Sequence, residues 1–184
     1  MSVPLRLISM ACTRASGSFL SRRMFVSTQP RRTAPAPTPP ATQAILRRSP
    51  TIEDINAAQL DVELLSHSDA QLAITERAAE QLHAISSQAE HAGSALRISV
   101  ESGGCHGYQY KLELTRQRAP EDYDFEHPVV PQARVTVDAV SLTLLRGSTV
   151  DFATELIGSS FRISSNPQAV GSGCGCGVSW EAKA

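Results

Sequence analysis

Residues 96–115 read LRISVESGGCHGYQYKLELT, and this stretch decides the fold of the chain. Apolar and polar residues alternate with a period of two on both sides of a glycine-rich bend, which is the pattern of half-buried β-strands. The apolar positions are Leu96, Ile98 and Val100 before the bend and Tyr108, Tyr110, Leu112 and Leu114 after it. The stretch therefore predicts two strands joined by a turn that contains Cys105.

The sequence before these strands predicts a helix over residues 75–87. Thr75 can cap the helix, and Ala78, Leu82 and Ile85 then recur at the spacing of one helical face. We expect that face to be buried against the strands.

The sequence after the two strands predicts further short elements and, with them, an α+β fold. They are strands at 134–138, 148–152 and 160–164 and a helix at 139–146 that ends at Gly147. Residues 116–131 are acidic and irregular, and Asn166-Pro167 is a turn signal that ends the regular part. Four glycines surround two cysteines between Gly171 and Gly177, so we expect a mobile C-terminal tail unless a ligand orders it.

The N-terminal segment differs sharply in charge from the rest of the chain. Residues 1–50 contain eight arginines, no lysine and no carboxylate. This composition is typical of a mitochondrial transit peptide, so we expect residues 1–29 to direct the protein to the mitochondrial matrix and to be removed. The alternative is a disordered basic arm that binds nucleic acid or acidic lipid.

The remaining chain predicts a linker followed by one acidic domain. Residues 30–70 form a proline-rich linker and a short lead-in, and residues 71–184 form the domain. Of the 17 basic and 18 acidic residues, 17 − 8 = 9 basic and all 18 acidic residues fall in 51–184, a formal net charge of −9. That charge argues against binding to nucleic acid, and no run of 18 apolar residues exists to span a membrane.

Three cysteines are the candidate site residues: Cys105 in the turn, and Cys174 and Cys176 near the C-terminus. Iron-sulfur clusters usually take four thiolates, and structural zinc takes four Cys or His ligands. Three thiols in one chain therefore indicate an incomplete site, whereas two copies offer six. Such shared, exposed ligation suits a protein that binds a cluster and then surrenders it.

Other interpretations of the cysteines remain open at this point. A zinc site would need a fourth ligand from His106 or from a second chain, and a redox disulfide between Cys174 and Cys176 would lack the usual Cys-x-x-Cys motif. Catalytic thiol chemistry would need a base, for which His106 is the available residue. Glu101 is more typical of a solvated carboxylate than of a ligand.

Five segments resemble the A-type iron-sulfur carriers, also called the HesB/IscA-like family, and within it the second mitochondrial branch. In order along the chain, they are Glu101–Tyr110, Val150–Ile157, Ser159–Phe161, Asn166–Ala169 and Cys174–Gly177. The resemblance implies a compact HesB-like fold of mixed, mainly antiparallel β-sheets with one or two flanking helices. It also implies that Cys105, Cys174 and Cys176 are ligands of an iron-sulfur cluster, [2Fe-2S] and/or [4Fe-4S], or of iron.

The resemblance further implies a non-enzymatic carrier that acts late in mitochondrial cluster assembly. Such a carrier supports [4Fe-4S] formation and passes clusters to apo-proteins such as aconitase and lipoate or biotin synthases. Its implied partners are a sister A-type carrier or a second copy of itself, a folate-binding-fold assembly protein and a monothiol glutaredoxin. The alternative is a metallochaperone that delivers mononuclear iron to another scaffold.

Overall fold

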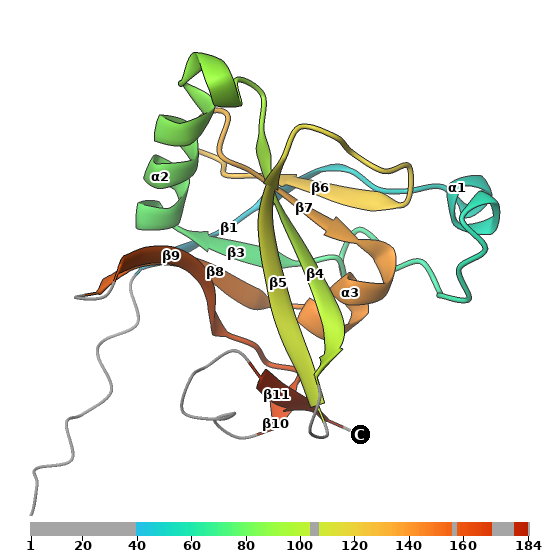
Figure 1. The fold of residues 1–184 in the computed structure, drawn as a ribbon. Coiled ribbons are helices and arrows are strands. Elements are labelled where there is room, and N and C mark those ends of the chain that lie inside the picture. Colours follow the sequence, from blue (N-terminus) through green and yellow to red (C-terminus); the bar gives the residue numbers. More distant parts are fainter. Residues whose placement is uncertain (1–39, 104–106, 156–157, 171–178, 184) are drawn as a thin grey trace, which may run out of the picture. The chain divides into compact units, whose positions relative to one another are not determined.

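The structure is a computed structural model that describes residues 40–103, 107–155, 158–170 and 179–183 (Figure 1). These residues form strands and a few short helices, so the predicted α+β class is confirmed. The elements are β1 (Ala41–Gln43), β2 (Ile45–Arg48), α1 (Ile52–Ala57), β3 (Leu72–Thr75), α2 (Glu76–Ser86), a 3₁₀ turn (Ala89–His91), β4 (Ala95–Gly103), β5 (Gly107–Thr115), β6 (Asp122–Glu126), β7 (Arg134–Asp138), α3 (Ala139–Leu145), β8 (Ser148–Glu155), β9 (Gly158–Ser165), β10 (Ala169–Val170) and β11 (Ser179–Ala182).

The strands form two sheets. One has four strands in the order β1-β3-β8-β9, and the other has seven in the order β10-β11-β5-β4-β7-β6-β2. Two of the strand pairs, β3 with β8 and β4 with β7, are parallel, and the other described pairs are antiparallel. The expectation of mixed, mainly antiparallel sheets is therefore confirmed.

The predicted hairpin forms the centre of the larger sheet. β4 and β5 pair over their whole length, from Ala95 opposite Thr115 to Gly103 opposite Gly107. Leu96 and Ile98 are fully buried, as the alternation predicts, whereas Leu114 near the far end of β5 is 42% exposed. The hairpin thus places the Cys105 turn at one end of a long antiparallel ladder.

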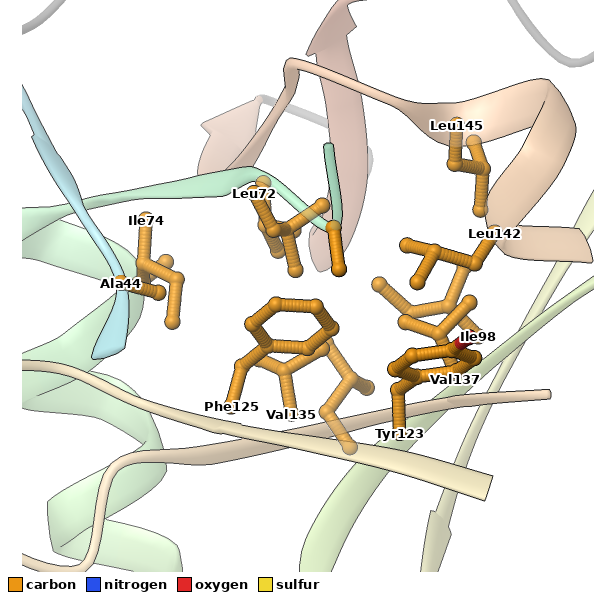
Figure 2. Packing of buried hydrophobic residues seen from close by; sticks show 14 of the residues in the cluster. Ala44, Leu72, Ile74, Ile98, Tyr123, Phe125, Val135, Val137, Leu142 and Leu145 are labelled. Atoms are coloured by element: carbon orange, nitrogen blue, oxygen red, sulfur yellow. The ribbon is translucent and has the colours of Figure 1, made fainter. Parts of the chain in front are cut away.

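The hydrophobic core joins residues from both sheets. Figure 2 shows the ring of Phe125 from β6 among side chains of the other core strands. The largest fully buried side chains in this cluster are Tyr123, Phe125, Leu72, Ile74, Leu96, Ile98, Leu142 and Leu145. Because both sheets contribute to one core, the two ladders are held together by apolar burial.

The two predicted helices are present with nearly the expected bounds. The hydroxyl of Thr75 accepts a hydrogen bond from the Ala78 amide at 3.3 Å and caps α2. Ala78 and Leu82 are buried as predicted, but Ile85 is only half-buried. In α3, Leu142 and Leu145 face the core, and Gly147 follows with φ +71°, which ends the helix.

Residues 41–48 differ from the expected linker. β1 pairs with β3 and β2 pairs with β6, so this short stretch adds an edge strand to each sheet. Ala44, between the two strands, is buried and donates its amide hydrogen bond to the Leu72 carbonyl at 2.8 Å. Prolines surround these strands without interrupting them, which is why composition alone predicted a linker.

Residues 116–131 also differ from the expected irregular loop, because they contain β6. Tyr123 and Phe125 are core residues, and the acidic residues Asp122 and Asp124, which alternate with them, are buried as well. Arg97 Nη1 donates to Asp122 at 2.6 Å, and Arg118 pairs with Asp124. Because each carboxylate is paired with an arginine, burying this acidic strand costs less free energy than burying unpaired charges would.

His127, directly after β6, is a buried neutral histidine. Its Nδ1 accepts backbone hydrogen bonds from Val129 and Val130 at 3.4 and 3.1 Å, and its exposed fraction is 4%. Burial lowers the pKa of His127 below its ordinary value of 6.5, against a smaller opposing effect of Glu76. Protonation would place a hydrogen on Nδ1 and remove both hydrogen bonds.

We expect the free energy of unfolding to decrease as the pH falls below about 6.5. In that range the unfolded chain binds a proton at His127 and the folded chain does not, at a cost of about 1.4 kcal/mol per unit of pKa difference. The measurement is urea unfolding at about pH 7.5 and about pH 5.5 for the wild type and for His127→Asn, which keeps an acceptor but cannot titrate. An equal pH dependence in both proteins would contradict this assignment.

Candidate functional site

The predicted ligands Cys105, Cys174 and Cys176 lie outside the described residues, as does His106. Within residues 40–103, 107–155, 158–170 and 179–183, no three His, Cys, Asp or Glu side chains gather closely enough to bind a metal ion. Glu101 is exposed and lies 3.5 Å from Lys111 Nζ, as expected of a solvated carboxylate. Described residues on either side of these cysteines anchor their segments to the seven-stranded sheet.

The first anchor is the end of the β4–β5 hairpin. Gly103 and Gly107 pair with each other on either side of the Cys105 turn. A Cβ atom on Gly107 would lie 2.6 Å from the backbone oxygen of Trp180, closer than side-chain carbons approach a backbone oxygen. Glycine at this position therefore allows β11 to lie directly against the start of β5.

The second anchor holds both ends of the segment that contains Cys174 and Cys176. β11 pairs with β5 through Ser179 opposite Gln109 and Trp180 opposite Tyr108, and β10 pairs with β11. Figure 1 shows β10 and β11 beside the end of β5 that begins at Gly107. Residues 179–182 therefore form the strand next to the edge of the seven-stranded sheet, whereas the glycine-rich residues 171–177, for which mobility was expected, lie outside the described residues.

Trp180 accounts for the attachment of β11 to the sheet. The indole is 5% exposed, and its ring centroid lies 5.3 Å from those of both Tyr108 and Tyr110. Aromatic pairs contribute about 0.5–1.5 kcal/mol each beyond the area they bury. Among the described residues, Trp180 Nε1 has no hydrogen-bond partner, so apolar packing holds the indole in place.

Asn166 connects this aromatic group to α3. Its Nδ2 donates to the Tyr110 hydroxyl at 3.0 Å and to the Leu144 carbonyl at 3.1 Å, and its Oδ1 accepts from the Gln168 amide at 2.8 Å. Burial raises the pKa of Tyr110 and outweighs the opposing effect of the hydrogen bond from Asn166. The phenol is therefore protonated at neutral pH. The sequence indicated only a turn here, and the side-chain role of Asn166 was missed.

Asp151 lies within the Val150–Ile157 segment that carries the family resemblance, but its contacts stabilise the fold. Its carboxylate is fully buried and accepts from Thr75 Oγ1 at 2.8 Å and from Arg77 Nη2 at 2.7 Å. Burial alone would raise the pKa of Asp151, but the hydrogen bonds from Arg77 and Thr75 outweigh that effect and hold the pKa below its usual value. The charged carboxylate therefore ties the start of α2 to β8.

The comparisons with known proteins agree with the resemblance that the sequence suggested. Residues 70–178 match the family model described as iron-sulphur cluster biosynthesis, which is more than half of the chain. The chain belongs to this family, and the predicted HesB/IscA-like assignment is confirmed.

The similar proteins have related names. Mouse and human "Iron-sulfur cluster assembly 2 homolog, mitochondrial" are each 42% identical over 115 residues, which is 62% of this chain and 70% of theirs. "Iron-sulfur assembly protein 2" of Schizosaccharomyces pombe is 40% identical over 110 residues, 60% of this chain. The chain thus spans 52% of that yeast protein.

Two solved structures are also similar to the chain. A crystal structure of IscA with the [2Fe-2S] cluster has 27% identity and a TM-score of 0.48, covering 61% of this chain and 98% of that one. Escherichia coli SufA, described as involved in biosynthesis of iron-sulfur clusters, has 28% identity and a TM-score of 0.49, covering 60% and 92%.

Within the described ranges, no helix is long and apolar enough to cross a membrane.

Proposed function

We propose that this chain is an iron-sulfur cluster carrier that holds its cargo through Cys105, Cys174 and Cys176 and passes it to apo-proteins by thiolate exchange. The cargo is a [2Fe-2S] and/or [4Fe-4S] cluster. The chain acts late in mitochondrial assembly, where it supports the formation of [4Fe-4S] clusters. No chemical conversion of a substrate by the chain itself is part of this role.

The close approach of Gly107 and Trp180 carries this proposal. Gly107 follows Cys105 by two positions, and Trp180 follows Cys176 by four. At about 3.6 Å per residue at most, the chain allows both thiols to reach a common point near this contact. Cys105 and Cys176, which are 176 − 105 = 71 positions apart in sequence, are thereby attached to one small region of β5, and this is a basis for shared ligation.

A second subunit completes the site in this proposal. One chain supplies three thiols, whereas a cluster usually takes four ligands. A homodimer, or a heterodimer with a sister A-type carrier, supplies six. Because two chains supply the ligands, the cluster lies at a subunit boundary, where an acceptor protein can approach it.

The proposal includes the cellular setting. Residues 1–29 act as a transit peptide, residues 30–70 lead into the carrier domain at 71–184 and add strands 41–43 and 45–48 to its sheets, and the protein works in the mitochondrial matrix. The mitochondrial names of the mouse and human relatives support this location. The specific partners are a folate-binding-fold assembly protein, a monothiol glutaredoxin and apo iron-sulfur enzymes.

The rival function is delivery of mononuclear iron, which the same thiols could bind. The family description and the names of the relatives favour cluster assembly over this rival. Native mass spectrometry of the anaerobically reconstituted protein tests the proposal, because it reports subunits, iron and sulfide together. Iron bound without sulfide would favour the rival.

A further inference from the structure

The segment with Cys174 and Cys176 is anchored by a group of side chains and short strands that we name the carboxyl-terminal clasp. It consists of Tyr108, Tyr110, Asn166, Trp180 and Lys183. Lys183 contributes at the far end of β11, where its Nζ donates to the Pro167 carbonyl at 2.6 Å and its amide donates to the Gln168 carbonyl at 2.8 Å. The clasp thus joins the residues before Gly171 to those after Val178.

Side-chain packing is the main force that can hold the clasp together. β11 meets β5 at two residue pairs and meets β10 at two residue pairs, so its backbone ladders are short. A short ladder near the edge of a sheet is among the first parts to open, because few contacts hold it. The burial of Trp180 against Tyr108 and Tyr110 therefore decides whether β11 stays on the sheet.

We infer that Trp180 is a positioning residue for the cargo: the clasp that it closes sets how long the cluster is retained, and opening of β11 accompanies release. The inference rests on the proposed function, since it requires that Cys174 and Cys176 bind the cluster. When β11 leaves β5, one end of the segment with these cysteines loses its attachment beside the Cys105 turn. Binding through both cysteine segments then becomes less favourable, and transfer to an acceptor becomes faster.

The unpaired indole nitrogen suggests a conservative variant. Because Trp180 Nε1 has no partner among the described residues, phenylalanine can replace the tryptophan without removing a hydrogen bond. Trp180→Phe keeps an aromatic ring on Tyr110, whereas Trp180→Ala removes it. A matched control is Phe161→Ala, which removes one ring of the Phe152–Phe161 pair in the other sheet, with centroids 4.9 Å apart.

The experiment compares the full-length wild type, Trp180→Ala, Trp180→Phe, Lys183→Ala and Phe161→Ala after anaerobic reconstitution with iron and sulfide. The rate of cluster transfer to an apo-ferredoxin is measured by visible circular dichroism. We expect transfer from Trp180→Ala to be at least about tenfold faster, which corresponds to about 1.4 kcal/mol. We expect Trp180→Phe to stay within about threefold of the wild type, Lys183→Ala to show a smaller acceleration than Trp180→Ala, and Phe161→Ala to match the wild type.

Hydrogen exchange of the cargo-free proteins provides the structural readout. Trp180→Ala should speed exchange of the β11 amides and leave those of β8 and β9 unchanged, which a general loss of stability would not do. Equal transfer rates in Trp180→Ala and the wild type would overturn the inference, as would an equal acceleration in Phe161→Ala. A wild type that holds no cluster would overturn the proposed function itself, and the exchange data would distinguish that outcome from a failure of the clasp.

Discussion

Replacing Cys105 by serine is expected to cause near-complete loss of bound cluster after anaerobic reconstitution. The variant retains two of the three candidate ligands per chain, and a serine hydroxyl is not a thiolate, which is the ligand that clusters take. The measurement is visible charge-transfer absorption together with bound iron and sulfide per chain. Because Gly103 and Gly107 pair without using the Cys105 side chain, the hairpin should still form.

Cys12→Ser is the matched control for this variant. Cys12 lies in the expected transit peptide, so its loss should leave the absorption and the iron content unchanged. Full-strength absorption in Cys105→Ser would show that this thiol is not a ligand. Loss of absorption in both variants would point to a general effect of removing a cysteine.

Gly107→Ala is expected to weaken cluster retention without removing any thiol. The added Cβ would lie 2.6 Å from the Trp180 backbone oxygen, so β5 or β11 must shift. Forcing one extra carbon into a well-packed contact costs about 1–3 kcal/mol, and the short β11 ladder is the part that can yield. We expect a reduced cluster content, faster hydrogen exchange in β11 and a core that remains folded.

Gly93→Ala is a control that strains the backbone elsewhere. Gly93 has φ +76°, and a Cβ added there would meet no atom within 4 Å, so alanine adds left-handed strain of about 1–2 kcal/mol without a steric contact. This variant should lose stability but keep its cluster. A Gly107→Ala protein that retains its cluster as well as Gly93→Ala does would contradict the role given to the Gly107–Trp180 contact.

The central hairpin could be predicted because its evidence is local. The alternation around Leu96, Ile98 and Tyr110, interrupted by a glycine-rich bend, contains both strands and their turn within a short stretch. The helix after Thr75 was equally predictable, because a capping hydroxyl and a regular apolar spacing are also local features. For these elements the local preference and the tertiary packing agree.

Strand β6 could not be predicted because its burial depends on distant partners. Asp122 and Asp124 made the segment look solvated, and their neutralising partners Arg97 and Arg118 are recognisable only once the sheet is formed. The strands in 41–48 were missed for a similar reason. Their stability comes from pairing with β3 and β6 and from the buried Ala44.

For the candidate site, the sequence predicted ligands that lie outside the described residues, and it did not predict the strands that anchor them. Cysteine spacing and the glycines around it indicated a shared metal or cluster site, and the resemblance selected the cluster. The anchoring of the C-terminal segment was missed, because the glycines between Gly171 and Gly177 suggested a free tail. Trp180 was the available signal, because the only tryptophan of the chain follows Gly177 by three positions and a large aromatic side chain favours burial.

Native mass spectrometry under oxygen-free conditions tests the central claim most directly, because one mass gives the number of chains, iron atoms and sulfides in the same particle. The account predicts a particle of two chains that contains one intact iron-sulfur cluster. It also predicts that the Cys105→Ser protein lacks this cluster. A single chain that holds iron without sulfide, or a cluster of unchanged mass in Cys105→Ser, would contradict the account.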